Sequence, residues 1–132
     1  MKLLRCLYIA LPLASFVAQS ADAQEYEPAE GDSVVIYTNK FRAEEFENAK
    51  KIMVEGFSGA IVSSGQSRRT FWMADESTGE IVGVSFFQQG HSVDEWHNHE
   101  ARQEVLDRLE PLRSAPLETV HYVVIGHHRA GQ

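Results

Sequence analysis

Four short runs of this sequence are apolar at both odd and even positions, and this feature restricts the possible fold most. The runs are VVIY at 34–37, TFWMA at 70–74, IVGVSFF at 81–87 and HYVVI at 121–125. Successive side chains of a strand point to opposite faces of its sheet, so a sheet with one face in water shows alternation. These runs do not alternate, and the sheet that they predict therefore needs cover on both faces.

Two helical patterns separate the predicted strands, which span 33–38, 69–74, 80–88 and 118–125. From Arg42 a 3.6-residue apolar period predicts an amphipathic helix that ends between Gly56 and Gly65, with the stripe Phe46, Ala49, Met53 and Phe57. A capping-box pattern at 92–95 (SVDE) starts a second helix, which runs to about Leu109 and is ended by Pro111 and Pro116. The polar loop 75–79 predicts a hairpin between the middle strands.

The resulting β-α-β-β-α-β order predicts an α+β, ferredoxin-like fold with an antiparallel sheet and both helices on one face. Because the other face is apolar too, we expect a second copy of the chain to cover it, giving a homodimer through the sheet face and a dimeric α+β barrel. The single domain is expected over 33–128, after a flexible polar lead-in at 24–32 and before a short tail at 129–132.

The amino terminus has the pattern of a signal peptide over residues 1–23. Lys2 and Arg5 flank an apolar stretch at 3–17, and Ala21-Asp22-Ala23 precedes the expected cleavage site. The stretch is shorter than the roughly 20 residues of a membrane-spanning helix, so no permanent membrane anchor is expected, a retained anchor being the alternative. We expect a periplasmic or secreted protein. Since Cys6 is the only cysteine, the mature chain has no thiol chemistry.

The charge and the motifs exclude several functions. The net charge of −7 comes without a basic stripe, so nucleic acid is not an expected partner. The sequence lacks the G-x-S-x-G, Walker, dinucleotide and H-E-x-x-H patterns that would support hydrolysis, nucleotide use or zinc proteolysis. His97 and His99 would point away from each other on a helix, so a metal site needs His91, His121 and His127 to converge. We expect neither a metal nor a cofactor.

The second helix carries two polar residues on its apolar stripe. Trp96, His99, Gln103 and Leu106 recur at helical spacing, and a buried histidine and amide need hydrogen-bond partners. One interpretation is a pocket for a small apolar or aromatic ligand, with apolar walls that include Trp72, Phe87 and Trp96. The other is a helix face shifted by one position, with His99 at the edge of the core.

Asn39 stands at the end of the first strand, where it would cap or turn the chain. Tyr37 and Tyr122 are interpreted as packing residues. The sequence identifies no catalytic residue.

Four local patterns resemble the dimeric α+β barrel superfamily, specifically its antibiotic-biosynthesis-monooxygenase-like domains, over about residues 34–127. They are Asn39-Lys40-Phe41, Glu55-Gly56-Phe57, Ser85-Phe86-Phe87 and the helix start Ser92 to Trp96. The resemblance implies two face-to-face sheets in a homodimer, and a pocket between sheet and helices in which Asn39 bonds to substrate or oxygen. The haem-degrading members are similar at Asn39 but differ at Phe87 and Leu106, where they have a catalytic tryptophan and a haem-ligating histidine.

Two functions follow as hypotheses. The first is an exported protein that binds an aromatic or apolar molecule and oxidises it as a cofactor-independent monooxygenase. The second is a non-enzymatic ligand-binding or stress-related module of the same fold.

Overall fold

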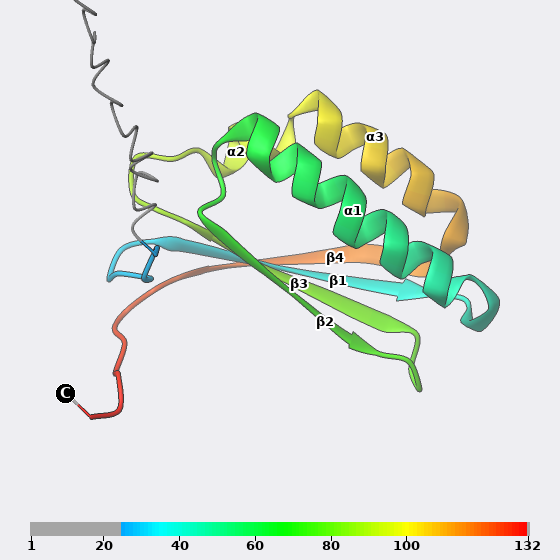
Figure 1. Ribbon diagram of the computed structural model, residues 1–132, viewed down its shortest axis with the longest axis horizontal. Coiled ribbons are helices and arrows are strands. Elements are labelled where there is room, and N and C mark those ends of the chain that lie inside the picture. The colour runs from blue at the N-terminus through cyan, green and yellow to red at the C-terminus, as the bar shows by residue number, and fades with distance from the viewer. Residues whose placement is uncertain (1–24, 132) are drawn as a thin grey trace, which may run out of the picture.

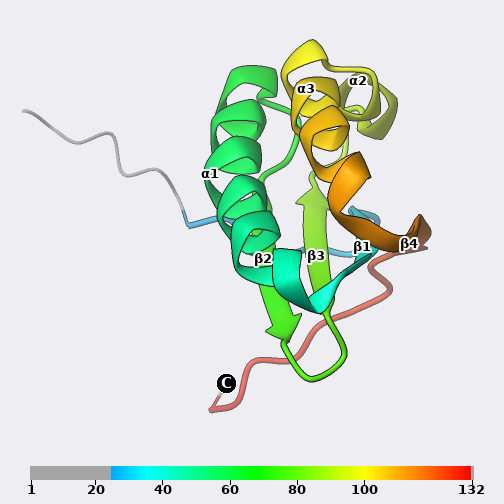
Figure 2. The same cartoon turned by 90° about the vertical axis from the view of Figure 1, so that its right-hand side faces the viewer.

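The computed structural model describes residues 25–131, and the predicted signal peptide lies outside them. The elements are β1 (Ser33–Phe41), η1 (Ala43–Glu45), α1 (Phe46–Ser64), β2 (Arg69–Asp75), β3 (Glu80–Phe87), α2 (Val93–His97), α3 (Glu100–Leu109), η2 (Glu110–Leu112) and β4 (Arg113–Val123). The four antiparallel strands are ordered β2-β3-β1-β4, and all helices lie on one face of the sheet (Figures 1 and 2). The predicted ferredoxin-like α+β fold is confirmed.

The face of the sheet beneath the helices holds the core. In β1 the side chains of Val35, Tyr37 and Phe41 are buried on this face, and the predicted stripe of α1 packs against them. The stripe residues Phe46, Ala49, Met53 and Phe57 are all buried, as expected. Full burial of a phenylalanine or methionine side chain stabilises a fold by about 1.5–3 kcal/mol.

The helix α1 continues past its two internal glycines to the far end of the predicted range. A Cβ on Gly56 would lie 2.8 Å from Cγ2 of Val105, so this glycine lets α3 pack closely against α1. The helix ends at Gly65, which has a φ of 66° and whose N–H donates to the carbonyl of Ile61. Glycine adopts this left-handed conformation after the last helical turn without strain, because it has no side chain.

The predicted second helix is two helices, and this corrects the expectation of one helix to Leu109. Ser92 caps α2 as predicted, since its hydroxyl accepts from the Glu95 N–H at 3.0 Å. The helix stops after His97, and His99 has the extended backbone (φ −68°, ψ 130°) of the residue before α3. The break changes the phase of the inward-facing stripe, which in α3 consists of Arg102, Val105 and Leu109.

The strand β4 begins at Arg113, five residues before the predicted start, and includes Pro116. Pro116 was expected to end a helix, and that expectation was wrong. Because β4 is an edge strand, a proline without an N–H is tolerated there. The pairing of β1 with β4 shifts register between Thr38 and Phe41, next to this proline.

Asp32 ties the segment before β1 to the domain. Its carboxylate accepts from the Tyr26 hydroxyl (2.5 Å) and from the N–H groups of Ala29 (2.9 Å) and Gln89 (3.1 Å). Burial raises the pKa of Asp32, but these hydrogen bonds and the nearby His91 outweigh it, so the pKa lies below its ordinary value. The described part of the expected flexible lead-in therefore makes specific contacts.

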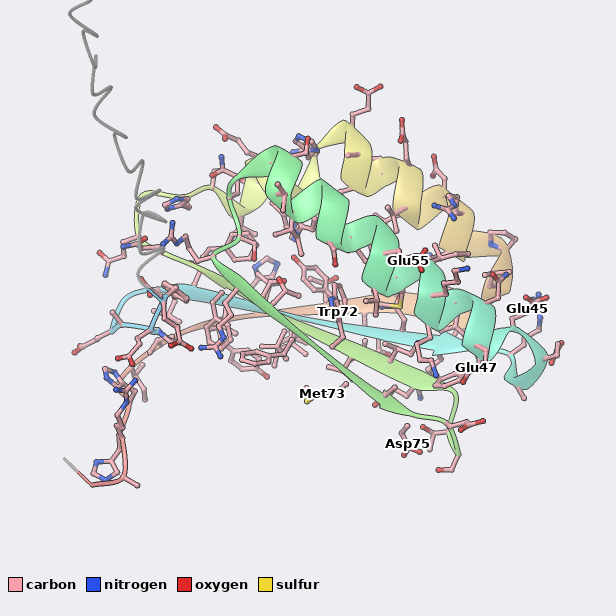
Figure 3. The ribbon with its side chains drawn as sticks, viewed as in Figure 1. Glu45, Glu47, Glu55, Trp72, Met73 and Asp75 are labelled. Carbon is pink, nitrogen blue, oxygen red and sulfur yellow. The ribbon has the colours of Figure 1, made fainter. Side chains whose placement is uncertain are left out.

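The opposite face of the sheet, the bare face, is apolar. Figure 3 shows neighbouring residues of β2 pointing to opposite sides, Trp72 toward the helices and Met73 away from them. The bare-face residues are Val34, Ile36, Phe71, Met73, Val82, Val84, Phe86, Val120 and Tyr122. Exposure reaches 53% for Met73 and 54% for Tyr122, although the ring of Tyr26 packs against Phe86 and the guanidinium of Arg69 lies over the ring of Phe71. No helix in this described range is long and apolar enough to cross a membrane.

Candidate functional site

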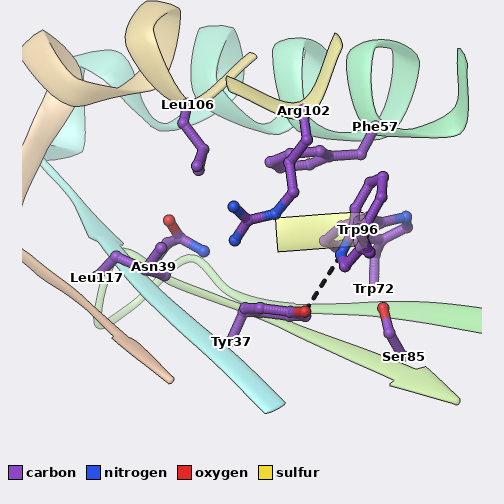
Figure 4. Close-up of a pocket in the computed structure, with 9 residues that line it drawn as sticks. All are labelled: Tyr37, Asn39, Phe57, Trp72, Ser85, Trp96, Arg102, Leu106 and Leu117. Atoms are coloured by element: carbon purple, nitrogen blue, oxygen red, sulfur yellow. Dashed lines mark hydrogen bonds between the residues drawn. The ribbon is translucent and has the colours of Figure 1, made fainter. Parts of the chain in front are cut away.

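A pocket lies between the sheet and the helices (Figure 4). Side chains from every strand and from α1, α2 and α3 line it: Tyr37, Asn39, Phe57, Trp72, Ser85, Trp96, Arg102, Leu106 and Leu117. Its volume is about 310 Å³ with the open mouth included, whereas the centre of a water molecule can reach only about 20 Å³. The smaller figure is the room inside the walls, enough for about one water. A larger ligand must displace a lining side chain.

The structure brings three of the six predicted site residues to the pocket. Asn39 and Trp96 are 2% exposed, and Trp72 is half-buried and stacks on Phe57 with ring centroids 5.4 Å apart. Gly83 lies opposite Trp72 in the sheet, where a Cβ would lie 2.5 Å from the indole ring. The glycine therefore leaves the space that the indole occupies beside the pocket.

The other three predicted residues do not line the pocket, which corrects their expected placement. Phe87 is 1% exposed and belongs to the apolar core at the end of β3. His99 borders an open depression on the outer surface, and Gln103 is exposed, with Nε2 donating to the carbonyl of His97. The helix break at His99 is the reason, because it turns both side chains away from the sheet.

Arg102 takes the inward position that Gln103 was expected to occupy. It is 7% exposed, its Nη1 donates to the carbonyl of His97 at 3.0 Å, and its guanidinium lies over the rings of Tyr37 and Trp96. Burial, with the charge of Arg113, lowers the pKa of Arg102, while Tyr37 opposes this shift. The helical spacing of Arg102, Val105 and Leu109 could have indicated this inward face. The assumption of one continuous helix from Ser92 placed Gln103 and Leu106 on the inward face instead.

A hydrogen-bonded chain connects the pocket with α2. The Trp96 indole N–H donates to the Tyr37 hydroxyl (3.2 Å), whose oxygen lies 2.8 Å from Nε2 of His97. An indole can only donate, so the hydroxyl hydrogen of Tyr37 is free to point to His97. Burial raises the pKa of Tyr37 to about 12, against the effects of Arg102 and Trp96. Burial, Arg102 and His121 lower the pKa of His97, so its ring is mainly neutral at pH 7. In the tautomer with its hydrogen on Nδ1, Nε2 accepts from the Tyr37 hydroxyl.

The histidines that could have formed a metal site do not gather. The rings of His97 and His121 lie 5.6 Å apart, but within residues 25–131 no group of three or more histidine, cysteine or acidic side chains is arranged to hold a metal ion.

Comparison with known proteins supports the fold. Neither known protein families nor curated proteins include a match to this chain. Among solved structures, Rv0793 from Mycobacterium tuberculosis is similar, with 11% identity and a TM-score of 0.63 over 74% of this chain and 99% of that chain. An antibiotic biosynthesis monooxygenase has 10% identity and a TM-score of 0.62 over 71% and 99% of the two chains. A dimeric ferredoxin-like protein of unknown function from Thermobifida fusca has 9% identity and a TM-score of 0.60 over 74% and 95%.

These similarities define the class at the level of the fold. The chain has the ferredoxin-like fold of the antibiotic-biosynthesis-monooxygenase-like domains, and the resemblance expected from the sequence is confirmed in that respect. Identities near one residue in ten carry no substrate or reaction to this chain, because one fold hosts many functions.

Proposed function

We propose that the protein binds a small aromatic molecule in the pocket between sheet and helices and oxidises it with molecular oxygen, without a cofactor. The lining of the pocket is the observation that carries this proposal. Four aromatic residues, Tyr37, Phe57, Trp72 and Trp96, surround a few polar groups. Aromatic walls with a small number of placed polar groups are typical of small-molecule sites, and they favour flat, apolar ligands.

Trp72 is the side chain best suited to make room for the ligand. It lies on the edge strand β2 and is half-buried, whereas Trp96 and Phe57 are held in the core. A flat ligand that displaces the Trp72 ring would stack on Phe57 in its place. Binding should therefore change the fluorescence of Trp72.

The Tyr37–His97 pair supplies a route for a proton that the substrate loses. The Tyr37 hydroxyl passes its hydrogen to Nε2 of His97 as it accepts the proton of the substrate, so no free tyrosinate forms despite the raised pKa. Oxidation of a ring CH₂ group to a carbonyl by O₂ releases one water, and the substrate itself supplies the electrons. The similar structures described as antibiotic biosynthesis monooxygenases support this type of reaction.

The bare face is proposed as the interface of a homodimer. Its apolar residues lie on all four strands, the most exposed of them on the edge strands β2 and β4, and a second copy of the sheet has the same size and character. The similar dimeric ferredoxin-like protein supports this arrangement. We further propose that the protein is exported to the periplasm or secreted after cleavage before Gln24, on the strength of the amino-terminal pattern.

The test combines binding and turnover. Purified protein is titrated with anthrones and aromatic quinols while tryptophan fluorescence and oxygen uptake are recorded. We expect saturable quenching that is largely lost in Trp72→Phe, and oxygen uptake that falls at least roughly tenfold in Tyr37→Phe. The alternative, a non-enzymatic ligand-binding module, predicts quenching without oxygen uptake. An absence of binding by every compound would contradict both functions.

A further inference from the structure

We propose that the aromatic ligand of this pocket carries an oxyanion, a carboxylate or a phenolate, and that Arg102 and Asn39 bind it. This inference rests on the proposed binding function and adds the charge of the ligand to it. The observation behind it is a buried guanidinium, facing the pocket, for which the described chain provides no counter-ion.

Arg102 lacks an acidic partner. None of the salt bridges within residues 25–131 includes it, and its side chain makes a single hydrogen bond, to the carbonyl of His97. The whole residue is only 7% exposed, so the guanidinium is largely removed from bulk water. Buried charges in proteins are paired or hydrogen-bonded because desolvation alone is costly. Figure 4 shows the guanidinium directed into the pocket toward Asn39, so the missing partner belongs in that space.

Asn39 presents a second donor to the same space. Its Oδ1 accepts from Nε and Nη2 of Arg113, both at 3.2 Å. An arginine can only donate, so the oxygen of the amide must face Arg113 and the NH₂ group must face away from it. The amide NH₂ makes no hydrogen bond within the described residues, and Figure 4 shows it turned toward Arg102. Both groups therefore offer donors to a ligand.

The electrostatic surroundings of these two residues favour an anion. Arg113, whose side chain is 6% exposed, adds a second positive charge near Arg102 and is itself paired with Glu110. The residues that line the pocket include no aspartate or glutamate, although the whole chain has a net charge of −7. No acidic side chain among these lining residues therefore repels a negative ligand.

The aromatic walls and the donors together select the ligand class. The ring of the ligand would pack among Phe57, Trp72 and Trp96, and its oxyanion would accept from Arg102 and Asn39. Hydrogen bonds to charged groups are stronger than neutral ones and correspond to roughly tenfold or more in affinity. An uncharged analogue of the same shape should bind weaker by this factor.

The experiment compares benzoate with benzamide, which differ in charge but hardly in shape. Dissociation constants are measured by NMR titration, with the indole N–H resonances of Trp72 and Trp96, which every variant retains, as local reporters. In the native protein benzoate should bind roughly tenfold tighter or more. Arg102→Met should abolish this preference and Arg102→Lys should keep part of it. Arg108→Met, at an exposed position of α3, is the matched control for net charge and should change nothing.

A second arm distinguishes the two sources of the oxyanion. The probe is 4-nitrophenol, whose phenolate is visible by its yellow absorption. If the pocket stabilises a phenolate, the pKa of the bound phenol falls in the native protein and not in Arg102→Met. A benzoate preference without this shift assigns an aromatic carboxylate.

Three outcomes decide between the proposals. Charge preference that depends on Arg102 supports the inference. Equal binding of benzoate and benzamide, together with an unshifted phenol, overturns the oxyanion but leaves aromatic binding intact. If no aromatic probe perturbs the pocket resonances, the proposed function fails and the inference fails with it.

Discussion

The two faces of the sheet carry similar apolar side chains but differ in what covers them. Beneath α1 and α3, side chains such as Val35 and Ile81 are 2% exposed or less, and the polar-edged pocket lies among them. On the bare face, Phe71 and Val120 remain 43% and 46% exposed, and the ion pair of Lys40 with Glu80 lies at one end of the face. The difference indicates two tasks: the helix-facing side combines a core with a ligand site, and the bare face is suited to association.

The largest expected effect is a charge placed at the centre of the bare face. Val84 lies on the interior strand β3, so Val84→Asp would bury an unpaired carboxylate in the proposed interface. We expect the dimer dissociation constant to rise by about a thousandfold. Analytical ultracentrifugation measures this, with Val62→Asp on the exposed side of α1 as control. A native protein that is monomeric in dilute solution would contradict the proposed interface and with it the comparison of the two faces.

A truncation beneath the helices should cost stability and not association. Leu109 is fully buried in the core, so Leu109→Ala should lower the free energy of unfolding by about 2–5 kcal/mol. Leu106 is half-buried and lies on the pocket wall, where it has fewer packing contacts. Leu106→Ala should therefore lower the free energy of unfolding by less than Leu109→Ala does. Urea unfolding at one protein concentration gives both values. Equal losses would mean that core and pocket are packed alike.

Replacing Arg102 tests whether this residue serves the ligand site and not the stability of the core. Replacement of an unpaired buried charge by an apolar side chain of similar length removes a desolvation cost, so Arg102→Met should raise the free energy of unfolding by about 1 kcal/mol. The carbonyl of His97 keeps a donor in Gln103. Thermal unfolding without ligand measures the gain, and Arg108→Met should stay near zero. A loss of stability would show that Arg102 holds the fold together.

The smallest expected effect is a pH dependence at the rim of the bare face. The pKa of Asp32 lies below its unfolded value, so the stability that it contributes is complete above about pH 4 and is lost as the pH falls through the lower folded pKa. Protonation should release Tyr26, which packs against Phe86 of the bare face. Hydrogen exchange of the Ala29 and Gln89 amides should quicken in acid. Asp32→Asn should remove this dependence.

Prediction from the sequence succeeded where local pattern and burial agree. The stripe of α1 and the cap at Ser92 were predicted because each depends on residues a few positions apart. It failed at His99 and Gln103, because a short break in a helix turns every later side chain to a new direction. Phe87 was expected in the apolar wall of the pocket, but the sequence does not distinguish a buried core position from a lining position, and the structure places it in the core.

The sequence by itself determined the order of the elements and the apolar character of the sheet on both faces, because the first helix follows from a 3.6-residue period and the strands follow from short apolar runs that do not alternate. The antiparallel sheet follows from that order. Only the tertiary structure decided which side chains meet in the pocket. Asn39, Trp72 and Arg102 come from β1, β2 and α3, and their meeting depends on strand order, on the glycine opposite Trp72 and on the phase of α3. Contacts between distant segments depend on packing of the whole domain, and no local pattern encodes them.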